Sequence, residues 1–100
     1  MNDYSAHRIK VSQFEGNNGG VRNQFIIETE KGVYFQSYNS IIAFKPFGYS
    51  WNSDRKIQLD IHYWDYSVTT GKYRNMFLEE NKKETERKIK EGIYELVDLN

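Results

Sequence analysis

The apolar residues of this chain change their spacing near residue 66, from every second residue to every third or fourth. Before that point, five runs alternate apolar with polar side chains, which is typical of strands that bury one face. These runs are residues 8–14, 21–30, 33–40, 40–45 and 56–63. After it, Tyr73 and Phe77 lie four residues apart, as on one side of a helix. The change of period predicts a fold in which strands come first and helices follow.

Capping residues place two helices after the strands. A Ser or Thr between residues 67 and 70 can cap a first helix that runs to residue 78. Asn81, with Glu84 three residues later, resembles a capping box at the start of a second helix. Gly92 is typical of the left-handed residue that ends a helix. The first helix is expected to pack on the sheet, and the second to lie on the surface.

We therefore expect an α+β fold, with an antiparallel meander sheet of about five strands, then two short helices and a final short strand. The chain is interpreted as a single domain over residues 1–100. It is mainly β over 1–66 and helical over 67–91, with a C-terminal strand over 93–99.

Composition excludes several classes of protein. The chain has no cysteine, which excludes a disulfide framework and a thiolate metal site. No segment approaches the roughly 18 consecutive apolar residues that span a membrane, so we expect no membrane partner and a cytoplasmic location. The 14 basic and 14 acidic side chains leave no net charge. Because strong nucleic-acid binding needs a surplus of Lys and Arg, this balance argues against direct nucleic-acid binding.

One cluster has the residue types of a metal site. Asp60, His62 and Asp65 could together bind a divalent ion, since Asp60 and His62 would share one face of a strand. The alternative is the polar outer face of an edge strand. The sequence has no phosphate-binding loop and no G-x-S-x-G nucleophile motif. We therefore predict no catalytic residue, no metal and no cofactor.

The segment 46–54 is the best candidate for a binding site. Phe47, Tyr49 and Trp51 alternate along it, and Arg55 and Lys56 follow. If the segment is extended, the three rings project to one side, where they could dock on a protein or stack on unpaired bases. The alternative is that the rings fold back as a lid over the core.

A second aromatic cluster lies where the strands give way to the helices. Bulky residues at such a junction lock a helix onto a sheet, so we interpret this cluster as structural. Its members are Tyr63, Trp64, Asp65 and Tyr66, with Tyr73 and Phe77 on the helix that follows.

Four stretches of the chain resemble a family of small proteins of unknown function that are carried by phages, prophages and plasmids of Gram-positive bacteria. They are Gln36–Ser40, Tyr63–Asn75, Phe77–Leu78 and Gly92–Asn100, and the resemblance covers roughly the last two-thirds of the chain. Relative to the family pattern, segment 46–54 looks like an insertion. The family has no assigned chemistry, so the resemblance implies no catalytic residues.

What the resemblance implies is a context. Small cysteine-free phage proteins often bind and block a host defence protein, so we expect an inhibitor of a bacterial defence system, most sharply an anti-CRISPR protein that binds an RNA-guided nuclease. An acidic helix face could then occlude a DNA-binding channel; the alternative is a helix exterior that only faces water. The acidic residues are Glu79, Glu80, Glu84, Glu86 and Glu91.

Two other functions stay open. A nucleic-acid-binding accessory protein would contact phosphate through basic side chains and stack bases on the aromatic ones. Those basic residues are Lys45, Arg55, Lys56, Lys72 and Arg74. A small metal-binding domain or enzyme would use the cluster around His62. A meander sheet also leaves edge strands through which a homodimer could form.

Overall fold

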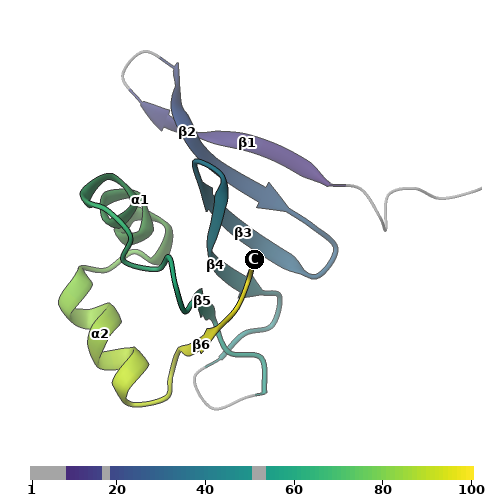
Figure 1. Cartoon of the computed structure of the whole chain (residues 1–100). Coiled ribbons are helices and arrows are strands. Elements are labelled where there is room, and N and C mark those ends of the chain that lie inside the picture. The colour runs from purple at the N-terminus through teal and green to yellow at the C-terminus, as the bar shows by residue number, and fades with distance from the viewer. Residues whose placement is uncertain (1–8, 17–18, 51–53) are drawn as a thin grey trace, which may run out of the picture.

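A single sheet, with its strands in chain order, organises the residues that this computed structural model describes, which are 9–16, 19–50 and 54–100 (Figure 1). The strands are β1 (Lys10–Gly16), β2 (Gly19–Glu28), β3 (Gly32–Ser37), β4 (Ser40–Pro46), β5 (Gln58–Asp60) and β6 (Glu95–Val97). Strands β1 to β5 pair antiparallel, and β6 joins β5 in parallel. Two helices, α1 (Val68–Leu78) and α2 (Lys82–Lys90), connect β5 to β6. The structure thus confirms the predicted meander, helices and final strand.

Both helices begin and end where the sequence predicted. The Ser67 side chain accepts a hydrogen bond from the Thr70 backbone N–H at 3.1 Å and caps α1. The Asn81 side chain accepts from the Glu84 backbone N–H at 2.9 Å and caps α2. Gly92 has a φ of 76°, a left-handed conformation that glycine adopts without strain and that turns the chain toward β6.

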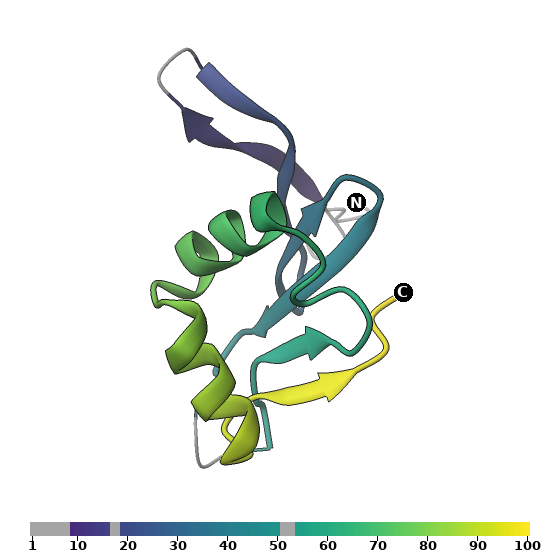
Figure 2. The ribbon, with the colours of Figure 1, turned by 60° about the vertical axis from the view of Figure 1, so that its left-hand side comes forward.

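The core lies between the sheet and the helices, which both lie on the same side of the sheet (Figure 2). Phe35, Ile42 and Leu59 on the central strands are completely buried. Phe35 packs against Phe77 of α1, with ring centroids 5.8 Å apart. Phe14 reaches the same core from β1, because an irregularity in the β1–β2 pairing lies at its position. No helix in the described part of the chain is long and apolar enough to cross a membrane.

The opposite side of the sheet carries apolar side chains that no described helix covers. The pairing register places Val11 opposite Ile27, Ile27 opposite Tyr34, and Tyr34 opposite Phe44, which makes one row across four strands. Phe25 lies on the same side, two residues before Ile27 on β2. We call these five residues the open face. Alternation within residues 40–45 predicts that Ile42 and Phe44 both face the core; Ile42 does, but an extra residue in β4 shifts the pairing and places Phe44 on the open face.

Candidate functional site

The open face is the clearest candidate for an interaction surface. The Tyr34 and Phe44 rings stack with centroids 4.3 Å apart, so the row forms one continuous apolar strip rather than isolated groups. Val11 keeps 58% of its surface exposed at one end of the row. At the other end Phe47 is exposed and lines a hollow together with Tyr34 and Phe44. A connected apolar strip that faces solvent is the usual mark of an interface.

The segment that follows β4 is a turn and is not extended. Gly48 has a φ of 76°, and the Tyr49 backbone N–H donates to the Pro46 carbonyl. Phe47 therefore faces the hollow beside the open face, whereas Tyr49 lines a different pocket beside the helices. Both rings remain about half exposed, at 52% and 50%, so they do not form a closed lid.

The structure describes two of the three remaining residues of the predicted aromatic site, Arg55 and Lys56. Trp51 lies outside the described residues. The Arg55 guanidinium donates to the Phe47 carbonyl at 3.1 Å and borders the same hollow as the Phe47 ring. Lys56 is half buried. Phe47 and Tyr49, the two described rings of the predicted row, thus line hollows on different sides of the sheet.

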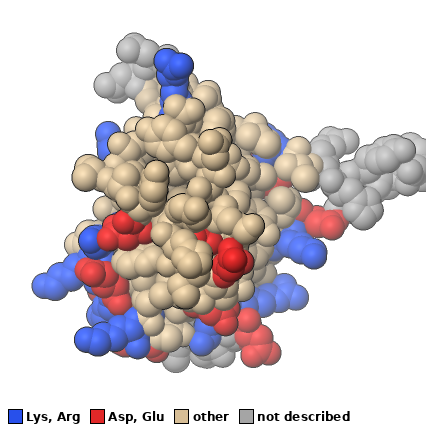
Figure 3. All heavy atoms as spheres, in the orientation of Figure 1, with Lys and Arg blue, Asp and Glu red and all other residues tan. Residues whose placement is uncertain are grey.

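Several of the helix charges are paired with one another. Arg87 bonds Glu84 at 2.7 Å and Glu91 at 2.9 Å. Glu80 is almost fully buried and accepts from Lys88 at 2.6 Å. Basic and acidic groups accordingly alternate at the lower left of Figure 3, where α2 lies in Figure 1. Of the predicted acidic residues, Glu79 and Glu86 remain exposed without an ion pair among those recorded for the described residues. The helix surface is thus of mixed sign.

The aromatic junction is organised by Arg74, which the nucleic-acid hypothesis assigned to phosphate. Its guanidinium is only 1% exposed, donates to the Trp64 carbonyl at 2.9 Å and pairs with Asp65 at 3.2 Å. It also lies over the Trp64 ring, 5.2 Å from the centroid. Arg74 therefore fastens the 63–66 turn to α1 and cannot reach phosphate, so that part of the hypothesis is wrong. Lys82 also bonds Asp65, at 2.7 Å.

Electrostatics in the junction follow from these contacts. Burial by itself would raise the pKa of Asp65, but the hydrogen bonds from Lys82 and Arg74 lower it by more, so the pKa lies below its usual value. The aromatic members pack around the same turn. The Tyr63 and Tyr66 rings meet edge to face at 5.7 Å. Tyr73 contacts Phe14, with centroids 5.2 Å apart, and Tyr66 keeps most of its surface exposed.

The metal hypothesis fails at Asp60. Strand β5 ends there, three residues short of the predicted strand end, so Asp60 and His62 do not share a strand face. The Asp60 carboxylate is buried and accepts from the backbone N–H groups of His62, Tyr63 and Leu99. It accepts a fourth bond from the Asn100 side chain at 2.9 Å. Among the described residues, no group of three His, Asp or Glu is placed to hold a metal.

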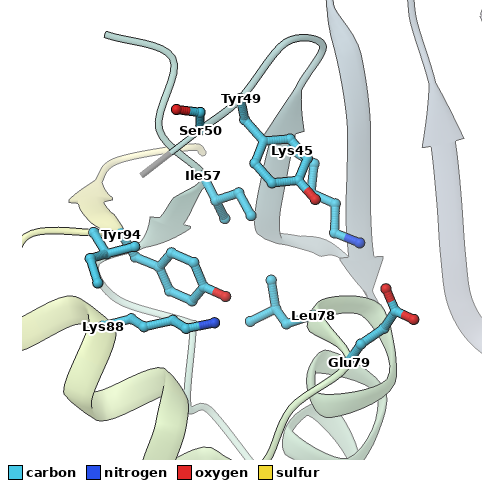
Figure 4. A pocket seen from close by; sticks show the side chains of 9 residues that line it. Lys45, Tyr49, Ser50, Ile57, Leu78, Glu79, Lys88 and Tyr94 are labelled. Carbon is cyan, nitrogen blue, oxygen red and sulfur yellow. The ribbon is translucent and has the colours of Figure 1, made fainter. Parts of the chain in front are cut away.

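Sequence reasoning missed the open face and a pocket on the other side of the sheet. Phe25, Ile26 and Ile27 are three consecutive apolar residues, and such a run indicates a strand with apolar side chains on both faces. The pocket has a volume of about 410 Å³ and lies between the end of β4 and the two helices (Figure 4). Lys45, which was assigned to phosphate contact, lines it. No local motif marks this pocket, because its walls come from five separate segments.

Comparison with known protein families gives a match. The model of a Family of unknown function (DUF8033) matches residues 9–92, which is most of the chain. No curated protein and no solved structure matches it.

Proposed function

We propose that this chain, which belongs to that family of unknown function, acts by binding another protein through the open face of its sheet. The observation that carries the proposal is the continuous row of Val11, Ile27, Tyr34 and Phe44 on the side of the sheet away from both helices. Exposed apolar surface costs free energy in water, and a partner that covers it recovers about 25 cal/mol per Å².

The chemistry of the partner surface follows from the edges of the row. Glu30, Lys31 and Arg55 border the hollow at the Phe47 end. An apolar centre with charges of both signs at its rim is the composition of a protein interface. It differs from the basic groove that a nucleic-acid backbone requires.

The sharpest version of the proposal is an inhibitor of a bacterial defence protein, with an RNA-guided nuclease as the partner. Its support is the resemblance of residues 36–40, 63–75, 77–78 and 92–100 to small proteins of phages and plasmids. Because basic side chains pair with Glu80, Glu84 and Glu91, three of the five predicted acidic residues, we assign recognition to the open face rather than to an acidic helix that imitates DNA.

The test compares two substitutions of the same kind on opposite sides of the sheet. Val11→Glu places a charge in the open face, whereas Val68→Glu changes a valine that is 92% exposed at the start of α1. We expect Val11→Glu to weaken binding to a purified type II RNA-guided nuclease about tenfold or more, and Val68→Glu to leave it unchanged. Binding is measured by biolayer interferometry, and inhibition by cleavage of a plasmid target.

The outcomes distinguish the general proposal, a protein partner on the open face, from the specific one, an RNA-guided nuclease. If the nuclease does not bind, the anti-CRISPR version is refuted, and the same two variants are compared in affinity capture from a Gram-positive lysate. A protein that the original chain and Val68→Glu capture equally, and Val11→Glu does not, supports the open face. Equal capture by both variants refutes it. A gel shift on single-stranded DNA, or a dimer in light scattering that Val11→Glu removes, would identify nucleic acid or a second copy as the partner instead.

A further inference from the structure

The pocket on the helix side has the size and lining of a small-molecule site. Its volume of about 410 Å³ lies within the range of ligand pockets, about 300–1,000 Å³. Ile57, Leu78 and Tyr94 form the floor, and each is at most 8% exposed. These three side chains come from the segment before β5, the end of α1 and the segment before β6. They converge on one hollow that polar groups surround (Figure 4).

Lys45 brings a positive charge to this apolar hollow. Its ammonium lies 4.3 Å from the centroid of the Phe77 ring, and none of the ion pairs recorded for the described residues includes it. Burial lowers the pKa of Lys45, and the more distant charges of Glu79 and Glu80 offset this only in part. A half-buried ammonium without a carboxylate partner is costly, and a bound anion would supply that partner.

Two other polar groups of the pocket, the Lys88 ammonium and the Tyr94 hydroxyl, are already engaged by Glu80 beside it. Glu80 accepts from Lys88 at 2.6 Å and from the Tyr94 hydroxyl at 2.9 Å, and its second oxygen accepts from Thr85 at 2.6 Å. Burial and this carboxylate raise the pKa of Tyr94, which keeps its proton on the hydroxyl. Lys88 and Tyr94 therefore act as fixed walls. Lys45 is left as the cation that can receive a ligand.

We infer that this pocket binds a small monocarboxylate with an apolar body. The carboxylate would pair with the Lys45 ammonium, and the body would cover Ile57, Leu78 and Tyr94. A single negative charge fits better than a phosphate, because Lys45 is the one ammonium lining the pocket that has no ion pair among those recorded for the described residues, and the Glu79 carboxylate stands on the same rim (Figure 4). Tyr49, which is half exposed, also lines the pocket and adds its ring to the surface that would contact the apolar body.

The experiment is an NMR titration of the whole chain with 3-phenylpropionate and, separately, with its uncharged amide. We expect the acid to shift the backbone signals of Ile57, Leu78 and Tyr94 and to bind about tenfold more tightly than the amide, because only the acid forms a charge-assisted pair with Lys45. Lys45→Met removes the charge but keeps the length and should weaken binding of the acid about tenfold. Glu79→Gln removes the charge that repels the carboxylate and should strengthen binding of the acid.

Lys72→Met is the matched control. Lys72 also lies over an aromatic ring, 5.3 Å from the Tyr73 centroid, but it does not line this pocket. The Lys72→Met variant should bind the acid with the same affinity as the original chain. Equal binding of acid and amide, an unchanged affinity in Lys45→Met, or no saturable shift with either 3-phenylpropionate or octanoate would overturn the inference. None of these results bears on the open face, which lies on the other side of the sheet.

Discussion

The sharpest test of the packing concerns Gln24, a polar residue in the interior. Its side chain on β2 is completely buried, and neither its amide nitrogen nor its amide oxygen has a hydrogen-bond partner among the described residues. It lies on the helix side, opposite Ser37 of β3. An amide removed from water without a partner costs about 1–3 kcal/mol. We therefore expect Gln24→Leu to stabilise the protein.

The magnitude follows from two contributions of the same sign. The substitution removes the cost of the unpaired amide, and leucine adds apolar burial at a similar volume. We expect the free energy of unfolding to rise by about 1–3 kcal/mol. For a chain of this length each kcal/mol raises the melting temperature by about 4–8 °C. Urea unfolding followed by circular dichroism measures the first quantity, and a thermal scan measures the second.

Gln36→Leu on the adjacent strand is the matched control. The Gln36 amide donates to the Tyr38 carbonyl at 2.7 Å, so the same change there removes a hydrogen bond and should not stabilise. The reasoning would be refuted if Gln24→Leu lowered the free energy of unfolding. That result would mean that the buried amide has a partner, such as an ordered water molecule, and contributes to stability.

The other stability predictions concern Asp60 and Gly32. Asp60→Ala should lower the free energy of unfolding by about 3–4 kcal/mol in urea titrations, because four donors lose their acceptor. Burial by itself would raise the pKa of Asp60, but the hydrogen bonds lower it by more, so the folded pKa lies below its usual value. The stabilisation by Asp60 is therefore complete above the unfolded pKa of about 4, and it is lost as the pH falls through the lower folded pKa. An acid titration should therefore show a smaller loss of stability in Asp60→Ala than in the original chain; an equal loss would contradict the assignment. Gly32→Ala should cost about 2 kcal/mol or more, because its new Cβ would meet the carbonyl oxygen of Lys45 and lie 2.7 Å from the Pro46 Cα; an unchanged melting temperature would contradict this.

The order of elements could be predicted because it depends on local patterns. Ser67 and Asn81 cap their helices through neighbours three residues away, so the sequence contains both partners of each bond. Gly92 turns the chain after α2 for an equally local reason, its positive φ. Strand alternation between residues 33 and 37 likewise showed which side chains face the core.

What could not be predicted depends on distant partners. The direction of Phe44 follows from the extra residue in β4, which only the pairing with β3 reveals. Asp60 looked like a surface residue of a strand, yet two of its donors lie 39 and 40 residues further along the chain. Lys45 and Arg74 looked like solvent-facing cations, and the tertiary fold buries Arg74 and half buries Lys45. The candidate sites are built from such contacts, so most of their geometry was out of reach of the sequence.

The parallel pairing of β6 with β5 has a consequence for how the protein is made. Gln58 on β5 bonds Glu95 on β6 across a separation of 37 residues, and both helices lie within that interval. During synthesis, the antiparallel strands β1 to β4 can pair as soon as they leave the ribosome. The outer edge of β5 stays without its neighbour until residues 95–97 have emerged. A chain that ends before residue 95 should therefore leave this edge of β5 open to pairing with another chain.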